Sequence, residues 1–252
     1  MANIFTSHSG LSPTARAYVM AGRGFVVDAA GRGDFTSVQS ACDALYARGG
    51  GGRVWVRNGT YYETISTNAS HDNLVIEGES WDTVIDGGTT NAYTCDLNGD
   101  YNTLLNIQVK NTAGAGNSAF AVFLDGDHAL AQRVYVPSSD AEGIYGDGSD
   151  WRVLDCVVMN ADARGIYFEG QWGKCIGNTV TGCGDDGIRV GGSDNSIYIG
   201  NKITNCGAYG LWLASFSDNC IVVGNRLSGN TSGAIHNQST NSEVGLNDGT
   251  QA

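Results

Sequence analysis

The segments GIYGDGSD (Gly143–Asp150), GIYFEGQW (Gly165–Trp172) and GIRVGGSD (Gly187–Asp194) are near copies of one another and follow at one constant interval. A residue equivalent to their opening glycine recurs on both sides, at Ala121, Gly210 and Gly233. A period this short does not fit repeats of paired helices, and the scaffold of leucine-rich repeats is absent. The spacing therefore predicts an all-β solenoid in which each copy is one coil of short parallel strands.

Apolar and polar residues alternate within the copies, as they do in strands with one buried face. Two inward columns are expected, one at Ile144, Ile166, Ile188 and Leu211 and one at Leu124, Phe168, Val190 and Leu213. A third is expected at Val136, Val158, Val180, Ile203 and Leu227. Together these columns predict one apolar core along the whole stack.

Three asparagines, Asn178, Asn201 and Asn225, each follow a glycine at the repeat spacing, and Cys156 falls in register with them. Amide side chains stacked in register can hydrogen-bond along the axis of the stack. We therefore predict a buried amide ladder that is structural and binds no ligand.

The seven cysteines show no Cys-x2-Cys spacing, and their number is odd. This pattern is typical of buried, reduced thiols, and neither a disulfide framework nor cysteine ligation of a metal is expected. Cys183 and Cys206 stand one coil apart and are interpreted as core filler.

The 252 residues are 41% hydrophobic, enough for a sizeable core, and their formal net charge is −12. Such an acidic balance argues against nucleic acid or an anionic membrane as the main partner. The start, MANIFTSHSG, lacks the features of a secretory signal, and no apolar run is long enough to span a membrane.

The segment VVDAAGRGDFTSVQSACDALYARGGGGRVWVRNGTYYETI (Val26–Ile65) predicts a strand, an amphipathic helix between Phe35 and Arg48, and a second strand after a glycine run. Together with the repeats, it resembles the capped N-terminal coil of the pectin-lyase-like superfamily. Within that superfamily the chain is most similar to phage tailspike and virion proteins, and also to pectin methylesterases. The resemblance implies a right-handed, single-stranded parallel β-helix of about seven coils with an N-terminal capping helix. The helix would cover strand edges that otherwise invite aggregation.

Function is sought on the outside of the coils, where side chains vary. The column two positions after the opening glycine holds large side chains: Phe123, Tyr145, Tyr167, Arg189 and Trp212. Two positions further lie Asn98, Asp125, Asp147 and Glu169, then Gly191 and Ala214. Just before the glycine stand Glu142, Arg164, Asp186 and Tyr209.

Three interpretations of this face stay open. It is a sugar-binding groove in which Asp147, Glu169 and Asp186 do acid–base chemistry, or a cation site formed by Asp125, Asp147 and Glu169. The third is a protein interface, because exposed aromatic and arginine side chains are enriched in interface cores.

Enzyme motifs of the resembled superfamily are largely missing. GCGDDGIRVGG (Gly182–Gly192) is similar to the paired aspartates of polygalacturonases, but their third Asp, Gly-His and Arg-x-Lys elements are absent. The Gln-Asp pair of pectin methylesterases is missing, and FLDGDHALAQ (Phe123–Gln132) lacks the Asp-Pro-His-Glu motif of mannuronan epimerases. Only Arg164 or Arg189 could supply the base of a polysaccharide lyase.

The sequence hypothesis is therefore a non-catalytic, tailspike-like virion protein that decorates a phage capsid or tail as a homotrimer and needs no cofactor or metal. Residues 1–24 form an arm that binds other virion proteins, residues 25–252 form the β-helix, and the stripe from Phe123 to Trp212 packs against neighbouring copies. The alternative is a polysaccharide lyase or glycoside hydrolase of the same superfamily, which would be secreted.

Overall fold

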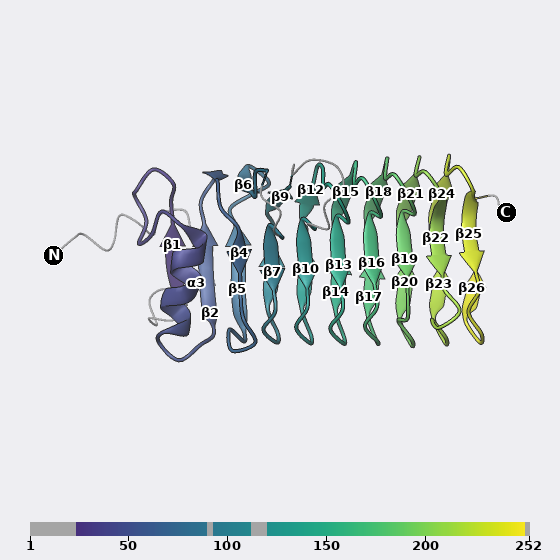
Figure 1. Ribbon diagram of the computed structural model, residues 1–252, viewed down its shortest axis with the longest axis horizontal. Coiled ribbons are helices and arrows are strands. Elements are labelled where there is room, and N and C mark those ends of the chain that lie inside the picture. Colours follow the sequence, from purple (N-terminus) through teal and green to yellow (C-terminus); the bar gives the residue numbers. More distant parts are fainter. Residues whose placement is uncertain (1–23, 90–92, 112–119, 250–252) are drawn as a thin grey trace.

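The computed structural model describes residues 24–89, 93–111 and 120–249, which form one elongated stack of about eight turns (Figure 1). Each coil adds one strand to each of three parallel sheets, which confirms the predicted parallel β-solenoid. Sheet A has ten strands: β1 (Gly24–Val27), β2 (Gly52–Val56), β5 (Leu74–Gly78), β8 (Thr103–Leu105), β11 (Leu130–Gln132), β14 (Arg152–Leu154), β17 (Lys174–Ile176), β20 (Ile197–Ile199), β23 (Ile221–Val223) and β26 (Glu243–Gly245).

Sheets B and C have eight strands each. Sheet B contains β3 (Gly59–Tyr61), β6 (Thr83–Asp86), β9 (Gln108–Lys110), β12 (Tyr135–Val136), β15 (Val157–Met159), β18 (Thr179–Thr181), β21 (Lys202–Thr204) and β24 (Arg226–Ser228). Sheet C contains β4 (Ile65–Ser66), β7 (Cys95–Leu97), β10 (Val122–Leu124), β13 (Ile144–Gly146), β16 (Ile166–Phe168), β19 (Ile188–Val190), β22 (Tyr209–Leu213) and β25 (Gly233–Asn237).

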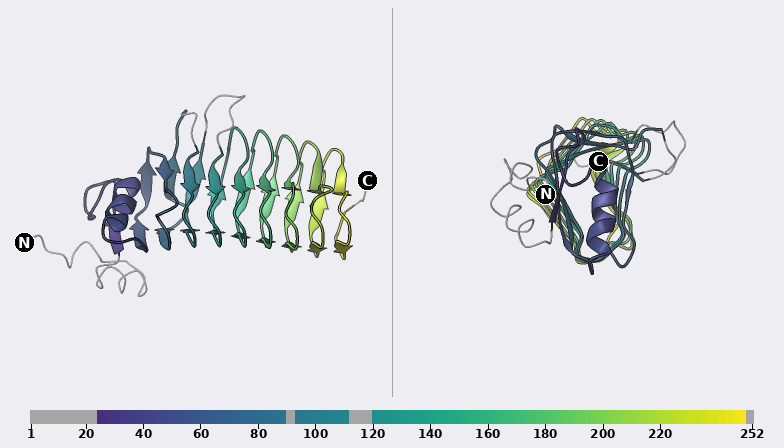
Figure 2. Two further views of the ribbon diagram at one scale, coloured as in Figure 1. Left: turned by 60° about the horizontal axis from the view of Figure 1, so that its bottom comes forward. Right: turned by 90° about the vertical axis from the view of Figure 1, so that its left-hand side faces the viewer.

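The expected capping helix is α3 (Val38–Tyr46), and it lies across the N-terminal end of the stack (Figure 2). Its first turn is fixed by Glu63, whose carboxylate accepts hydrogen bonds from the Val38 amide at 2.8 Å and the Ser37 hydroxyl at 2.7 Å. The helix buries Val38, Ala41, Cys42 and Leu45 against the first coils, which confirms the predicted apolar side. Among the described residues, no helix is long and apolar enough to cross a membrane.

The predicted inward columns are all buried, and neighbouring coils hold them in the expected register. The bulkiest of the fully buried side chains is Trp151, whose ring lies flat on that of Phe168 with centroids 3.2 Å apart. Gly173, one coil further, leaves the space that this indole fills, because a Cβ there would overlap the Trp151 ring. Core volume is therefore shared between neighbouring coils.

The asparagine ladder is present and buried. The Oδ1 of Asn201 accepts the Asn178 amide at 3.0 Å, and the Oδ1 of Asn225 accepts the Asn201 amide at 2.9 Å. Asn178 in turn accepts the Cys156 amide at 2.8 Å, and Asn247 extends the ladder by one coil. All seven cysteines are free and buried, as predicted.

The register of the last coil corrects one sequence assignment. Gly233 pairs with Tyr209, so Ala234, and not Gly233, is equivalent to the repeat glycine Gly210. The loop between β22 and β23 has one residue more than the corresponding loop between β19 and β20. The paired residues Ile197 and Ile221 are therefore one position further apart in the sequence than the paired residues Ile188 and Leu211. The arm predicted at residues 1–24 lies outside the described residues except for Gly24, which begins β1.

Candidate functional site

The outer face of sheet C carries the predicted stripe in one continuous register. Phe123, Tyr145, Tyr167, Arg189 and Trp212 are direct neighbours on adjacent strands, and each is partly exposed. At about 4.8 Å per coil, these five residues extend over roughly 20 Å along the stack. The same column continues to Ser66 and Asp96 at one end and to His236 at the other.

The aromatic rings of the stripe contact one another. Phe123 and Tyr145 are stacked with centroids 5.1 Å apart, and Tyr145 and Tyr167 follow at 5.2 Å. Arg189 lies over the Trp212 ring at 4.1 Å and Arg164 over the Tyr167 ring at 4.7 Å, both as cation–π contacts. The stripe is therefore a packed aromatic surface, and two guanidinium groups lie over the rings of its C-terminal half.

Carboxylates flank the stripe where the sheet C strands end. Glu169 accepts hydrogen bonds from the hydroxyls of both Tyr145 and Tyr167. Gly191 makes room for this arrangement, because a Cβ there would lie 2.6 Å from the Tyr167 hydroxyl oxygen. Desolvation, followed by the hydrogen bond to Glu169, raises the pKa of Tyr167 to about 12, so both hydroxyls are donors at neutral pH.

Two further carboxylates continue this acidic row. Asp125 accepts a hydrogen bond from the Asn98 amide nitrogen at 2.7 Å, and Asp147 is the more exposed of the two carboxylates. Partial burial raises the pKa of Asp147 above its usual range, and the neighbouring charges of Glu169 and Asp125 add to that shift. The pKa of Asp125 is also raised by partial burial.

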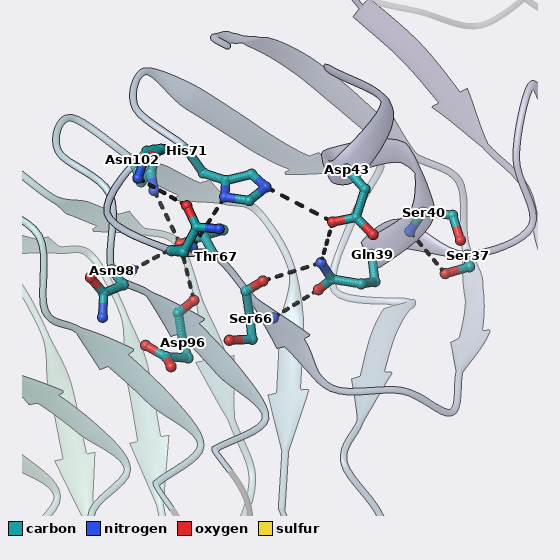
Figure 3. Close-up of polar contacts among 12 residues, drawn as sticks. Ser37, Gln39, Ser40, Asp43, Ser66, Thr67, His71, Asp96, Asn98 and Asn102 are labelled. Atoms are coloured by element: carbon teal, nitrogen blue, oxygen red, sulfur yellow. Dashed lines mark hydrogen bonds and ion pairs between the residues drawn. The ribbon is translucent and has the colours of Figure 1, made fainter. Parts of the chain in front are cut away.

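Asp96 begins the stripe at the N-terminal end of the stack. Burial, with a contribution from Asp125, raises its pKa to about 6, and its Oδ1 is buried without a hydrogen-bond partner. Figure 3 shows how the helix covers this edge of sheet C: Gln39 accepts from the Ser66 amide at 2.8 Å and donates to the Ser66 carbonyl at 3.1 Å. The side chain of Gln39 thus takes the place of a further strand.

Asp186 lies on the opposite side of the stripe, before β19. It is fully buried, accepts the Tyr209 amide at 3.0 Å and has its Oδ2 at 3.6 Å from Arg189. Burial raises its pKa to about 6. Next to it, Arg164 joins Glu142 at 2.7 Å and Asp185 at 3.5 Å. Both arginines that could act as a lyase base are therefore held in ion pairs within the chain.

The structure brings Asp125, Asp147 and Glu169 together but leaves Asp186 apart from them. Glu169 lies beside Gly191, five residues along the chain from Asp186, because Phe168 pairs with Val190. Five residues of extended strand span roughly 16 Å, well beyond the separation of paired glycosidase carboxylates. Among residues 24–89, 93–111 and 120–249, no three His, Cys, Asp or Glu side chains are grouped so that they could hold a metal ion.

Sequence reasoning missed Asp96 and His236 as members of the stripe. His236 was hidden by the additional residue before β23, which shifts its coil by one position. Asp96 pairs with Phe123 and lies two positions before Asn98, so the register that placed Asn98 beside Asp125 could have found it. Phe120 precedes its strand and contacts both Phe123 and Tyr145, and Tyr209 at the equivalent position of a later coil contacts Trp212 and His236 in the same way.

Known proteins share this architecture. A family model described as a right handed beta helix region matches residues 142–247. The chain is similar in structure to the Dettilon tailspike protein, with a TM-score of 0.68 and 14% identity over 79% of this chain and 42% of the other. For the catalytic unit of a GH87 alpha-1,3-glucanase from Streptomyces thermodiastaticus, the TM-score is 0.67 at 16% identity, covering 79% of this chain and 39% of that one.

A third similar structure is the periplasmic alginate epimerase AlgG, with a TM-score of 0.59 at 15% identity over 82% of this chain and 52% of the epimerase. A comparison with curated proteins finds no match. The chain spans about two fifths of the length of the tailspike protein and of the glucanase unit. The three-sheet stack, the matched β-helix region and these shared folds show that this chain has the right-handed parallel β-helix fold.

Proposed function

We propose that this chain is a tailspike-like virion protein that binds a polysaccharide along the outer face of sheet C and does not cleave it. The observation that carries the proposal is the continuous aromatic run Phe123–Tyr145–Tyr167, flanked on one side by the carboxylates of Asp125, Asp147 and Glu169. Aromatic faces pack against the C–H surface of sugar rings, and carboxylates accept hydrogen bonds from sugar hydroxyls.

An elongated ligand suits this face better than a compact one. The stripe follows the axis of the stack from Asp96 to His236, and every coil adds one side chain to it. A chain of similar sugar units presents ring after ring along such an axis. The ligand class expected is therefore a polysaccharide rather than a single small sugar.

A homotrimer that buries this stripe, as the sequence hypothesis stated, is the weaker arrangement. It would bring the carboxylates of Asp96, Asp125 and Asp147 from several copies towards one another and remove them from water. Desolvating like charges is costly without cationic partners, and the two arginines on this face are already paired within the chain. Sugar hydroxyls impose no such cost.

Glycoside hydrolysis is the second candidate, favoured by the raised pKa of Asp147 beside Glu169. In this interpretation Asp147 would be the general acid and Glu169 the partner carboxylate. Against it, both oxygens of Glu169 are occupied by tyrosine hydroxyls, and Asp186, the third carboxylate of the sequence-based alternative, lies on the far side of the stripe. These contacts favour binding over cleavage.

The test is a binding screen of the purified chain against immobilised bacterial surface polysaccharides and uronate polymers, followed by titration of the best one. Tyr145→Ala and Tyr167→Ala should each raise the dissociation constant about tenfold or more, equivalent to the loss of roughly 1.4 kcal/mol. Tyr62→Ala, on a side chain that is 82% exposed and outside sheet C, is the matched control and should leave binding unchanged.

Release of new reducing ends by the wild-type chain, abolished in Asp147→Asn, would transfer the assignment to hydrolysis. No binding to any polysaccharide would remove the proposal. The virion location is tested separately, by looking for this chain in purified particles with mass spectrometry.

A further inference from the structure

The outer face of sheet A carries a row of aliphatic side chains that no part of the binding surface uses. From β17 to β23 its outward positions are Lys174, Ile176, Ile197, Ile199, Ile221 and Val223. Five of these six are branched aliphatics, each partly or well exposed, with Ile221 at 37%. Leu154 and Leu105 continue the row toward the N-terminus.

Sheet B provides a control within the same coils. Its outward positions from β18 to β24 are Thr179, Thr181, Lys202, Thr204, Arg226 and Ser228, and none is aliphatic. Threonine is β-branched like isoleucine and suits a strand equally well. Strand propensity alone therefore does not explain why sheet A carries isoleucine where sheet B carries threonine.

We propose that the outer face of sheet A is the surface through which copies of this chain associate side by side, with their stacks parallel. Contiguous apolar patches of this kind mark interfaces in soluble proteins. The proposal does not depend on the binding function of sheet C, because the two sheets face different directions around the stack.

The shape of the row points to a second copy of the chain. The strands that carry the row, β17, β20 and β23, follow one another along the axis of the stack (Figure 1), so the row repeats about every 4.8 Å. A partner must offer a flat apolar surface with the same repeat to interdigitate with it, and the sheet A of another copy does so. A rotation axis parallel to the stack places equal coils at equal height, so aliphatic coils meet aliphatic coils and the assembly closes.

The distribution of charge also favours a second copy of the chain as the partner of this face. The chain has a formal net charge of −12, so most faces of two copies repel each other. The outward positions of sheet A from β8 to β23 nevertheless carry no carboxylate, and they include the cations Arg152 and Lys174. The carboxylate of Asp150, beside this face, lies 3.6 Å from the Lys174 ammonium and is held in an ion pair with it. On this face two copies therefore approach with less acidic repulsion than on the others.

The test measures the mass of the full chain in solution by light scattering over a range of concentrations. The wild type should be oligomeric, and Ile176→Asp with Ile199→Asp should be monomeric at the same concentrations. The matched control, Thr181→Asp with Thr204→Asp, places the same charges outward on the same coils but on sheet B, and should keep the wild-type mass.

A second, more conservative double substitution guards against a variant that simply fails to fold. Ile176→Thr with Ile199→Thr keeps β-branching and installs the residues that sheet B carries, and should raise the dissociation constant about tenfold. A wild-type chain that is monomeric throughout the range overturns the proposal. So does an unchanged mass in the folded isoleucine variants, or an equal loss of mass in the threonine control. Dissociated variants should still bind polysaccharide, which keeps failure here distinct from failure of the sheet C site.

Discussion

The outer faces of sheets A and C are made by the same coils and share the same strand spacing, yet their side chains differ in kind. Sheet C exposes stacked aromatic rings beside a row of carboxylates, and sheet A exposes aliphatic side chains without a carboxylate from β8 to β23. Inward positions are apolar on both sheets, because both cover one core. The coil thus fixes the inside, while each outer face is free to acquire its own chemistry.

The largest effect is expected where both faces depend on one residue of the core. Gly173→Ala would drive a methyl group into the Trp151 ring, which packs under sheet C and directly precedes the sheet A strand β14. We expect the free energy of unfolding to fall by about 3 kcal/mol, with polysaccharide binding and association weakened together. Chemical denaturation measures the first effect.

Gly192→Ala is the control for that change, because the nearest atom to its added Cβ lies 3.8 Å away. It should alter the free energy of unfolding by no more than about 0.5 kcal/mol. Equal effects of the two substitutions would show that Trp151 does not limit the space in the core.

A smaller loss is expected from the asparagine ladder, which stabilises both faces without belonging to either. Asn201→Ala removes the acceptor of the Asn178 amide and leaves that buried group unpaired. The free energy of unfolding should drop by about 1 to 3 kcal/mol, while the folded protein still binds polysaccharide and associates. Lost binding at unchanged stability would contradict the structural role of the ladder.

The pH dependence of the free energy of unfolding should depend on residues near sheet C and not on the aliphatic residues of sheet A. Burial raises the pKa of Asp96 and of Asp186 to about 6, so between about pH 4 and 6 the folded chain binds more protons than the unfolded chain. These two groups therefore lower the free energy of unfolding as the pH rises through that range. Asp186→Asn should flatten this slope in denaturation curves, and Ile199→Thr should leave it unchanged. A steeper slope in Asp186→Asn would refute the assignment.

The smallest effect is expected when an outward residue of sheet A is replaced by the type found on sheet B, or the reverse. Thr204→Ile should change the free energy of unfolding of the monomer by no more than about 0.5 kcal/mol, because both residues suit an outward strand position. Ile199→Thr, measured at a concentration where the chain is monomeric, should be similarly neutral. If Ile199→Thr lowers the free energy of unfolding of the monomer by much more than about 0.5 kcal/mol, the aliphatic row stabilises the fold itself and is not explained by association.

Much of the fold was predictable, because coil length and strand alternation are local properties. The spacing of Gly143, Gly165 and Gly187 revealed the repeat, and the apolar side of the segment after Phe35 revealed the capping helix. The stripe on sheet C followed from counting two positions beyond each glycine. Counting failed at Gly233, where one additional residue in a loop shifts the register and brings His236 into the stripe.

By itself, the sequence determined the solenoid, its core columns, the asparagine ladder and the aromatic stripe, because each is set by residues at one nearly fixed spacing. Only the tertiary structure decided which polar groups meet. Asp186 and Glu169 belong to neighbouring coils, but the strand between them holds their backbones roughly 16 Å apart. The aliphatic row of sheet A also emerged only when the coils were stacked, since each coil contributes just one or two of its members. Stacking turns side chains that are a whole coil apart in the sequence into direct neighbours, and that neighbourhood defines both surfaces.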